Sequence, residues 1–126
     1  MAFEESLETI TMIAGADYSD GSAHYRFVVP TSTAKTLVRA SAAGANADGI
    51  CQDEPSEGHA SCIAIGGVSK VIAGAAITAG AKIMSDDQGR AVTATSGNYV
   101  LGTAINSAAA AGIVIPVLFS KNGRAA

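Results

Sequence analysis

Three carboxylates stand close together near the middle of the chain, in the stretch Asp53-Glu54-Pro-Ser-Glu57. Paired carboxylates act as acid and base in glycoside hydrolysis, and clustered carboxylates bind Ca²⁺. The spacing does not match an EF-hand loop, and aromatic residues, which usually wall a sugar-binding cleft, make up only 5% of the chain. We therefore interpret Asp53, Glu54 and Glu57 as a solvent-exposed turn, with a salt-bridge contact to a basic partner as the alternative.

Lys82 is the second candidate for chemistry, because it lies in an Ala-Lys-Ile-Met run. A swinging-arm carrier domain presents its modified lysine at the tip of a tight hairpin. Here the turn signal comes four residues later, at Asp86-Asp87-Gln88-Gly89, where glycine supplies a positive φ. The pattern therefore predicts a solvent-facing strand lysine at Lys82 and a hairpin turn at 86–89.

Histidine and cysteine are scarce, with two of each in the whole chain. His24 and His59 lack ligand-like spacing, so a metal site with Cys51 and Cys62 is disfavoured. We expect two reduced, half-buried thiols, although a disulfide across neighbouring strands is geometrically possible. The chain also lacks a nucleophile elbow, a zinc-protease helix motif and a phosphate-binding loop. We predict no catalytic residues, no cofactor and no metal, and hence a binding or structural module.

The composition points in the same direction. Of the 126 residues, 48% are apolar and only 15% are charged, against about 25% charged in ordinary domains. A surface with so little charge tends to be covered by partners. The eight Lys and Arg residues are dispersed and the net charge is −3, so nucleic-acid binding is disfavoured. No export signal is evident, and the longest nearly uncharged stretch, 91–120, is a poor candidate for a membrane span.

Short strands and frequent turns dominate the rest of the sequence. We expect strands within residues 24–30, 35–40, 49–52, 59–65, 68–74, 75–85, 90–94, 98–106 and 113–120. Turns every 8 to 12 residues are typical of a barrel or sandwich. The Ala-rich stretch 107–112 is too short for a stable helix. The predicted fold is mainly β, a small single-domain barrel or sandwich, with an N-terminal arm at 1–16, a β-rich domain at 17–120 and a C-terminal tail at 121–126.

A weak internal echo accompanies this layout. Gly49-Ile-Cys-Gln, a loop, Gly58 and an apolar strand ending at Ile65 follow one order, and Gly102-Thr-Ala-Ile-Asn, a loop, Gly112 and IVIPVLF follow the same one. Two copies of a strand-loop-strand unit would produce this echo, although Ala- and Gly-rich sequences generate such echoes easily.

The stretches YRFVV (25–29), GICQDEP with Gly58 (49–58), SKVIAGAAITAG (69–80), SDDQGRA (85–91) and GTAI with Gly112 (102–112) form a familiar order of strands, glycines and turns. In this order the chain resembles the small capsid cement, or head decoration, proteins of tailed phages, over residues 17–120. The resemblance implies a β-rich domain on the outside of an icosahedral shell, commonly a trimer, that clamps neighbouring major capsid protein subunits after expansion. It brings no catalytic motif.

With this resemblance, we expect the protein in the virion, on the capsid exterior, after synthesis in the host cytoplasm. Its expected partners are the major capsid protein and further copies of itself. As capsid-contact residues we predict Phe3, Leu7 and Ile10 in the arm, as apolar anchors, and Asp53, Glu54 and Glu57 in the acidic turn. The alternatives left open are a swinging-arm carrier domain and a small β-barrel hydrolase or ligand-binding module.

Overall fold

The computed structural model describes residues 4–121 and 123–125. The described residues contain no helix, so the mainly-β prediction is confirmed. The strands are β1 (Glu5–Ala14), β2 (Phe27–Pro30), β3 (Thr36–Arg39), β4 (Gly49–Cys51), β5 (Ala60–Ile72), β6 (Lys82–Ser85), β7 (Ala91–Thr93), β8 (Gly102–Ala104) and β9 (Val114–Phe119). The predicted turn at 86–89 separates β6 from β7, with a φ of 74° at Gly89.

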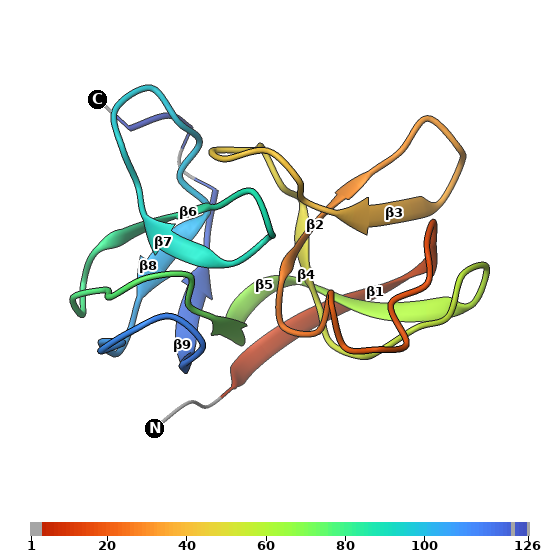
Figure 1. The fold of residues 1–126 in the computed structure, drawn as a ribbon, viewed down its shortest axis with the longest axis horizontal. Coiled ribbons are helices and arrows are strands. Elements are labelled where there is room, and N and C mark those ends of the chain that lie inside the picture. The colour runs from red at the N-terminus through yellow and green to blue at the C-terminus, as the bar shows by residue number, and fades with distance from the viewer. Residues whose placement is uncertain (1–3, 122, 126) are drawn as a thin grey trace.

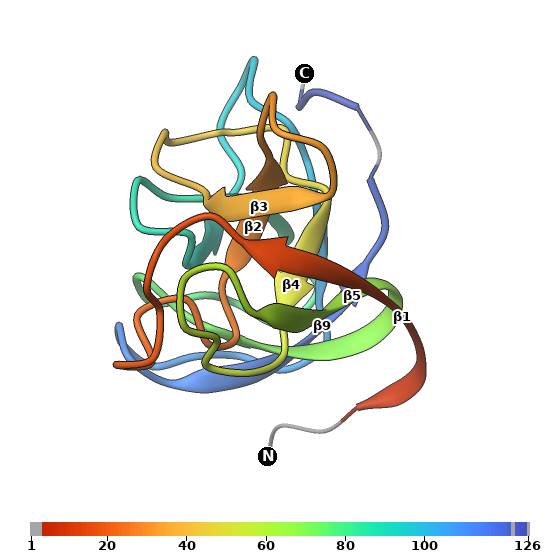
Figure 2. The ribbon, with the colours of Figure 1, turned by 90° about the vertical axis from the view of Figure 1, so that its right-hand side faces the viewer.

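The strands form two small closed barrels, seen as two lobes in Figure 1. In the first barrel the hydrogen-bonded order is β1-β3-β2-β4-β5, and β5 returns to pair with β1. In the second the order is β5-β9-β8-β6-β7, closed by a parallel bridge between Ala73 and Ala91. Figure 2 shows β1 and β5 lying side by side on the near side of the first barrel. Residues 5–14 of the predicted arm are therefore a strand of this barrel.

The long strand β5 belongs to both barrels. Its first half pairs with β4 and β1, and its second half pairs with β9. The prediction that residues 59–65 and 68–74 are separate strands, split at Gly66-Gly67, was wrong, because the strand continues through both glycines. Gly67 has a φ of 85°, and any Cβ there would collide with the carbonyl of Ser6 on β1. The glycine thus allows β5 to bend from one barrel into the next without leaving the sheet.

The two barrels are copies of one pattern. The register that pairs Val28 with Gly49 in the first barrel pairs Ile83 with Gly102 in the second. Hydrogen bonds outside the strands repeat as well. The amide of Gly15 donates to the carbonyl of Leu37, and the amide of Gly74 donates to Ala91. Positions 9–16 correspond to 68–75, and positions 58–65 correspond to 112–119.

The internal echo predicted from residues 49–65 and 102–119 is confirmed by these registers, and it extends further than predicted. The same tetrapeptide, Ile-Ala-Gly-Ala, opens both copies, at 13–16 and at 72–75. In each copy the glycine of this tetrapeptide donates its amide to the strand that closes the barrel. The whole described fold is therefore a tandem repeat joined through β5.

Each barrel is filled by its own inward-facing side chains. The first barrel holds Ala14, Tyr18, Val28, Leu37, Cys51 and Ile63. Their counterparts in the second barrel are Ala73, Ile77, Ile83, Ala91, Ala104 and Val117, and all of these are buried too. A further set of buried residues from the first barrel, including Phe27, Ile50 and Ala64, belongs to the same cluster as the second barrel's core. The two barrels therefore share one apolar interface.

Candidate functional site

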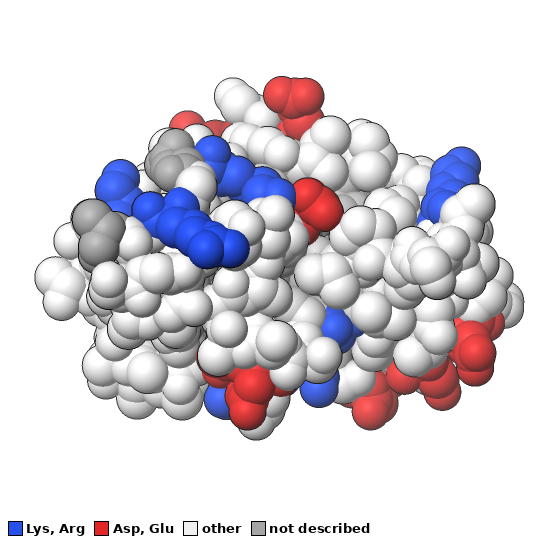
Figure 3. Space-filling model, turned by 90° about the horizontal axis from the view of Figure 1, so that it is seen from above, with Lys and Arg blue, Asp and Glu red and all other residues white. Residues whose placement is uncertain are grey.

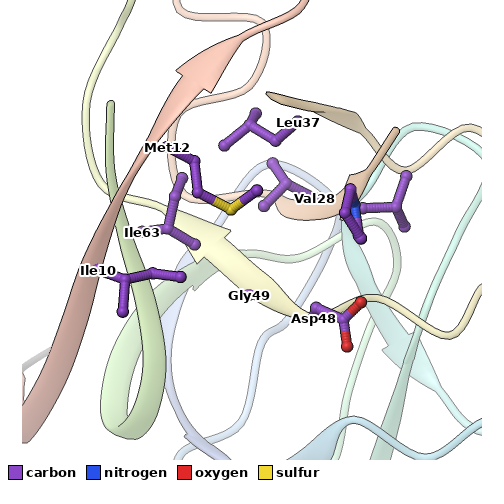
Figure 4. Close-up of a pocket in the computed structure, with 9 residues that line it drawn as sticks. Ile10, Met12, Val28, Leu37, Asp48, Gly49 and Ile63 are labelled. Atoms are coloured by element: carbon purple, nitrogen blue, oxygen red, sulfur yellow. The ribbon is translucent and has the colours of Figure 1, made fainter. Parts of the chain in front are cut away.

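An apolar pocket opens at one end of the first barrel (Figure 4). Ile10 and Met12 on β1 and Ile63 on β5 face Val28 on β2 and Leu37 on β3 across it. The remaining lining comes from Val29, Pro30, Asp48 and Gly49. Alternation along β5 places Ile65 on the same side of the strand as Ile63, beside Gly49. We call this surface, with Ile65, the open mouth.

The size and chemistry of the pocket suit an apolar side chain. Its volume is about 210 Å³, which is below the ~300 Å³ at which small-molecule sites begin. Its one charged lining residue is Asp48, which is exposed and bound to Lys121 across a Nζ–Oδ1 distance of 2.8 Å. The pocket therefore offers hydrophobic contact and lacks the converging polar groups that would orient a small ligand.

The corresponding end of the second barrel is closed. The residues that correspond to Ile10, Pro30 and Asp48 are Ser69, Ser85 and Leu101, and all three are fully buried. The first barrel covers them. Gln52 Nε2 donates to Ser69 Oγ at 2.9 Å, and the Gly44 amide donates to the Ser85 carbonyl at 2.8 Å. One mouth of the repeat is thus filled within the chain and the other is exposed.

The predicted arm contacts lie on and before β1. Ile10 is exposed at the open mouth, whereas Leu7 is half-buried and packs against the core shared by the two barrels. Phe3 lies outside the described residues. The structure therefore places Ile10 in an apolar pocket and gives Leu7 a contact within the chain.

The predicted acidic turn follows β4. Asp53 is engaged within the chain, because its two carboxylate oxygens accept hydrogen bonds from Ser61 Oγ at 2.6 Å and from the Cys62 amide at 3.0 Å. Glu54 lies 3.4 Å from His24 Nδ1, and Glu57 is exposed. The outward-facing charge of this turn is therefore carried by Glu54 and Glu57, while Asp53 holds the turn against β5.

The fold keeps the two predicted groups apart. The acidic turn lies at the end of β1 that finishes with Ala14, whose carbonyl accepts the amide of Gly58. Leu7 is seven residues earlier on the same strand, which corresponds to a separation of about 20 Å. A single small contact cannot include both ends of β1.

The remaining candidates for chemistry have structural surroundings. Lys82 begins β6, and its Nζ donates to Thr103 Oγ1 at 3.1 Å. Cys51 and Cys62 are free thiols, the first buried and the second exposed, and burial raises the pKa of Cys51. Among residues 4–121 and 123–125, no three His, Cys, Asp or Glu side chains gather closely enough to hold a metal ion. The same residues include no helix of the length and hydropathy needed to cross a membrane.

Charge is sparse on the surface. Figure 3 shows a face that is mostly white, the colour of residues other than Lys, Arg, Asp and Glu, with an elongated basic group over the lobe that contains β6–β9 and smaller basic and acidic groups elsewhere. Arg26 lies at the junction of the barrels, where partial burial lowers its pKa and the neighbouring Arg39 and Arg90 lower it further. This weakly charged surface agrees with the composition.

Sequence reasoning missed most of the open mouth. The sequence assigns Val28, Pro30 and Leu37 to strands and Asp48 to a loop, and it gives no sign that they meet. The signal that could have found them is the repeated Ile-Ala-Gly-Ala, because aligning the copies on it places Ile10 opposite Ser69. An exposed isoleucine where the other copy has a buried serine marks a surface that the two copies use differently.

Comparison with known proteins agrees with this architecture. The base of the head fibre gp8.5 from bacteriophage phi29 is a similar solved structure, with a TM-score of 0.71 and 18% sequence identity, covering 95% of this chain and 99% of that one. At this identity the likeness shows a shared fold. No curated protein sequence matches the chain significantly.

The family comparison is more specific. The sequence model of the phage cement proteins matches residues 18–119, which include β2 to β9 and most of the first barrel. The resemblance drawn from strands and turns is confirmed by this match. The chain therefore belongs to the phage cement protein family and is a structural protein of the phage capsid.

Proposed function

We propose that this protein decorates the outer surface of the expanded capsid and stabilises contacts between major capsid protein subunits. The family match over residues 18–119 carries the proposal. In this proposal the protein is made in the host cytoplasm, binds the shell after expansion and sits there as a trimer. Its role is mechanical and it has no catalytic step.

The physical properties of the chain support a clamp. Small side chains lose little rotamer entropy when they are buried, so an Ala-rich surface can mate closely with a neighbour at low ordering cost. Weak contacts repeated around a symmetric shell add up through multivalency. A weakly charged surface also avoids the desolvation cost of burying unpaired ions.

The separation of the predicted contacts suits this role. A clamp must contact more than one subunit, and the segment before Leu7 and the turn with Glu54 and Glu57 lie at opposite ends of β1. We propose that the N-terminal segment, including Phe3, contacts one capsid subunit and that the acidic turn contacts a basic patch on another. Asp53 positions the turn through Ser61 and Cys62.

The proposal is tested by mixing the purified protein with undecorated expanded capsids and imaging them by cryo-electron microscopy. We expect added density at regular positions on the outer surface and a higher temperature of capsid disruption. Capsids that stay bare at saturating protein would overturn the proposed function.

The contact surfaces are tested separately. The double variant Glu54→Lys and Glu57→Lys reverses the charge of the turn, and we expect its capsid affinity to fall at least tenfold because opposite charges guide such contacts. Asp87→Lys, at an exposed acid in the β6–β7 turn, is the control for a charge reversal outside the proposed contact. Deletion of residues 2–4 removes the N-terminal segment without touching β1. Equal binding by the turn variant and the wild type would refute the acidic contact alone.

A further inference from the structure

The exposed large hydrophobic side chains of the described residues have an uneven distribution. They are Ile10 (43% exposed), Ile65 (37%), Ile105 (38%), Ile113 (40%) and Leu118 (40%). Ile10 and Ile65 lie at the open mouth of the first barrel. Ile105 and Leu118 lie on the outside of the second barrel, on or next to β8 and β9. The tandem repeat explains why these four residues are exposed.

Within the chain, the outside of the first barrel covers the mouth of the second. The covering surface, which we call the outer face, includes Phe27, Ile50, Ala64 and Gln52. The ring of Phe27 lies 6.3 Å from that of Phe119, and Ile50 and Ala64 are fully buried in the shared core. Gln52 donates from its side chain to Ser69.

The repeat places each of the four, Ile10, Ile65, Ile105 and Leu118, at a position that is part of this contact in the other copy. The strand registers make Leu118 the counterpart of Ala64, because Ile50 pairs with Ala64 as Thr103 pairs with Leu118. Gln52 and Ile105 correspond because their amides donate to the matching carbonyls of Cys62 and Pro116.

The mouths match in the same way. Ile10 corresponds to Ser69, and Ile65 corresponds to Phe119. The pair that is polar inside the chain, Gln52 with Ser69, therefore becomes the apolar pair Ile105 with Ile10.

The chain thus carries two unpaired halves of one kind of interface: the open mouth of the first barrel and the outer face of the second. We propose that the open mouth of one copy receives the outer face of the second barrel of another copy, head to tail. In this contact Ile105 of one copy packs on Ile10 of the next, as Gln52 meets Ser69 within the chain. Leu118 takes the place of Ala64 and fills the pocket that Ala64 would leave underfilled.

Charge supports a second copy as the occupant. The outer face of the second barrel carries Lys82, the counterpart of Phe27, next to Thr103. The rim of the open mouth carries the exposed acid Glu8, against Gly66, and Asp48, which is paired with Lys121 of the same chain. Lys82 thus approaches the carboxylate of Glu8 when the two surfaces meet, and this attraction favours the head-to-tail contact.

The C-terminal segment makes the proposed contact between copies differ in one place from the contact between the two barrels within the chain. Inside the chain, Gly44 donates its amide to Ser85, but its counterpart Gly97 donates to the carbonyl of Ala125. Residues 123–125 therefore occupy the edge of the loop at 97–100, and the contact between copies rests on β8 and β9, with Ile105 and Leu118 at its centre.

A head-to-tail contact is heterologous, so it closes into a ring when the rotation between copies allows and otherwise continues as a filament. This assembly does not depend on the capsid. Self-association without capsid binding would overturn the proposed function and leave this inference standing. Capsid binding by a protein that does not self-associate would overturn this inference and leave the capsid-binding proposal standing.

The test uses the full chain and analytical ultracentrifugation over a dilution series. We expect the wild type to form a closed oligomer, and Ile10→Lys and Ile105→Glu each to weaken self-association at least tenfold. Ile113→Lys is the matched control, because Ile113 is equally exposed and corresponds to His59, outside both surfaces. Leu118→Lys replaces Ile105→Glu if that variant does not fold.

Mixing the variants distinguishes a head-to-tail contact from a symmetric one. Ile10→Lys keeps an intact outer face and Ile105→Glu keeps an intact mouth, so an equimolar mixture should associate through the intact pair of surfaces, although each variant alone is impaired. Combining both substitutions in one chain should restore part of the assembly through the new ion pair. A wild type that is monomeric throughout, a mixture that stays monomeric, or an Ile113→Lys variant as impaired as Ile105→Glu would each overturn the proposal.

Discussion

At the scale of single residues, Asp53 has a role different from that of its acidic neighbours. Its carboxylate accepts from a buried hydroxyl and from a backbone amide, and both bonds fix the turn to β5. A hydrogen bond to a charged acceptor contributes more than a neutral one, and a buried donor left without a partner is costly.

We therefore expect Asp53→Ala to lower the free energy of unfolding by about 1–3 kcal/mol. Glu57→Ala, four residues later and exposed, should change it by less than about 0.5 kcal/mol. Urea denaturation followed by circular dichroism measures both. Equal effects of the two substitutions would show that the hydrogen bonds of Asp53 do not stabilise the fold.

The two thiols differ in solvent access. Cys51 is inside the first barrel and burial raises the pKa of its thiol, so little reactive thiolate is present at neutral pH. Cys62 points outward from β5.

We expect an aromatic disulfide reagent to modify the exposed Cys62 quickly and the buried Cys51 only after unfolding. Cys62→Ser should abolish the fast phase, and Cys51→Ser should abolish the slow one. Two fast phases in the folded protein would contradict the burial of Cys51.

At the scale of elements, the close approach of strands depends on two equivalent glycines. A Cβ on Gly49 would lie 2.8 Å from the carbonyl oxygen of Ala64, and one on Gly102 would collide with the carbonyl of Leu118. The two positions begin β4 and β8, which have the same place in the repeat. Both barrels therefore need a residue without a side chain at this point.

Gly49→Ala and Gly102→Ala should each cost about 2 kcal/mol of stability through overpacking. Gly66→Ala is the control on a strand, because its Cβ would meet Glu8 at an ordinary contact distance of 3.5 Å. Thermal denaturation of the three variants compares the sites. A Gly66→Ala variant as unstable as the other two would point to a general effect of alanine in these strands.

At the scale of the whole molecule, the shared strand β5 and the shared apolar core should make the two barrels unfold together. A substitution that destabilises the core of either barrel should then lower the stability of both barrels. Leu37 fills the first barrel and Ile83 fills the second, and both are fully buried.

We expect Leu37→Ala and Ile83→Ala each to cost about 2–5 kcal/mol and to shift one common calorimetric transition. Hydrogen exchange should show the first half of β5 among the most protected segments, because it pairs with β1 on one side and with β4 on the other. Two separate transitions in the Leu37→Ala variant would mean that the second barrel is stable without the first.

Much of the local structure follows from the residues themselves. The β-branched runs predicted most of the strands, Asp86-Asp87-Gln88-Gly89 predicted the hairpin turn, and the echo around Gly49 and Gly102 predicted the repeat. These features depend on neighbours in the chain, where backbone preference and alternation act directly. The order of strands and turns was also specific enough to indicate the cement protein family.

The break predicted at Gly66-Gly67 was wrong, because local sequence signals do not show which strand lies next to a glycine. Two glycines usually end a strand, but here Ser6 on β1 approaches Gly67 so closely that glycine is required inside one. The open mouth and the outer face could not be predicted from the sequence either. Alternation tells which residues share a side of a strand, but it does not tell what lies against that side. Only the packing of one barrel on the other decides that the mouth with Ser69 is covered and the mouth with Ile10 is open, because covering depends on contacts between residues far apart in the chain.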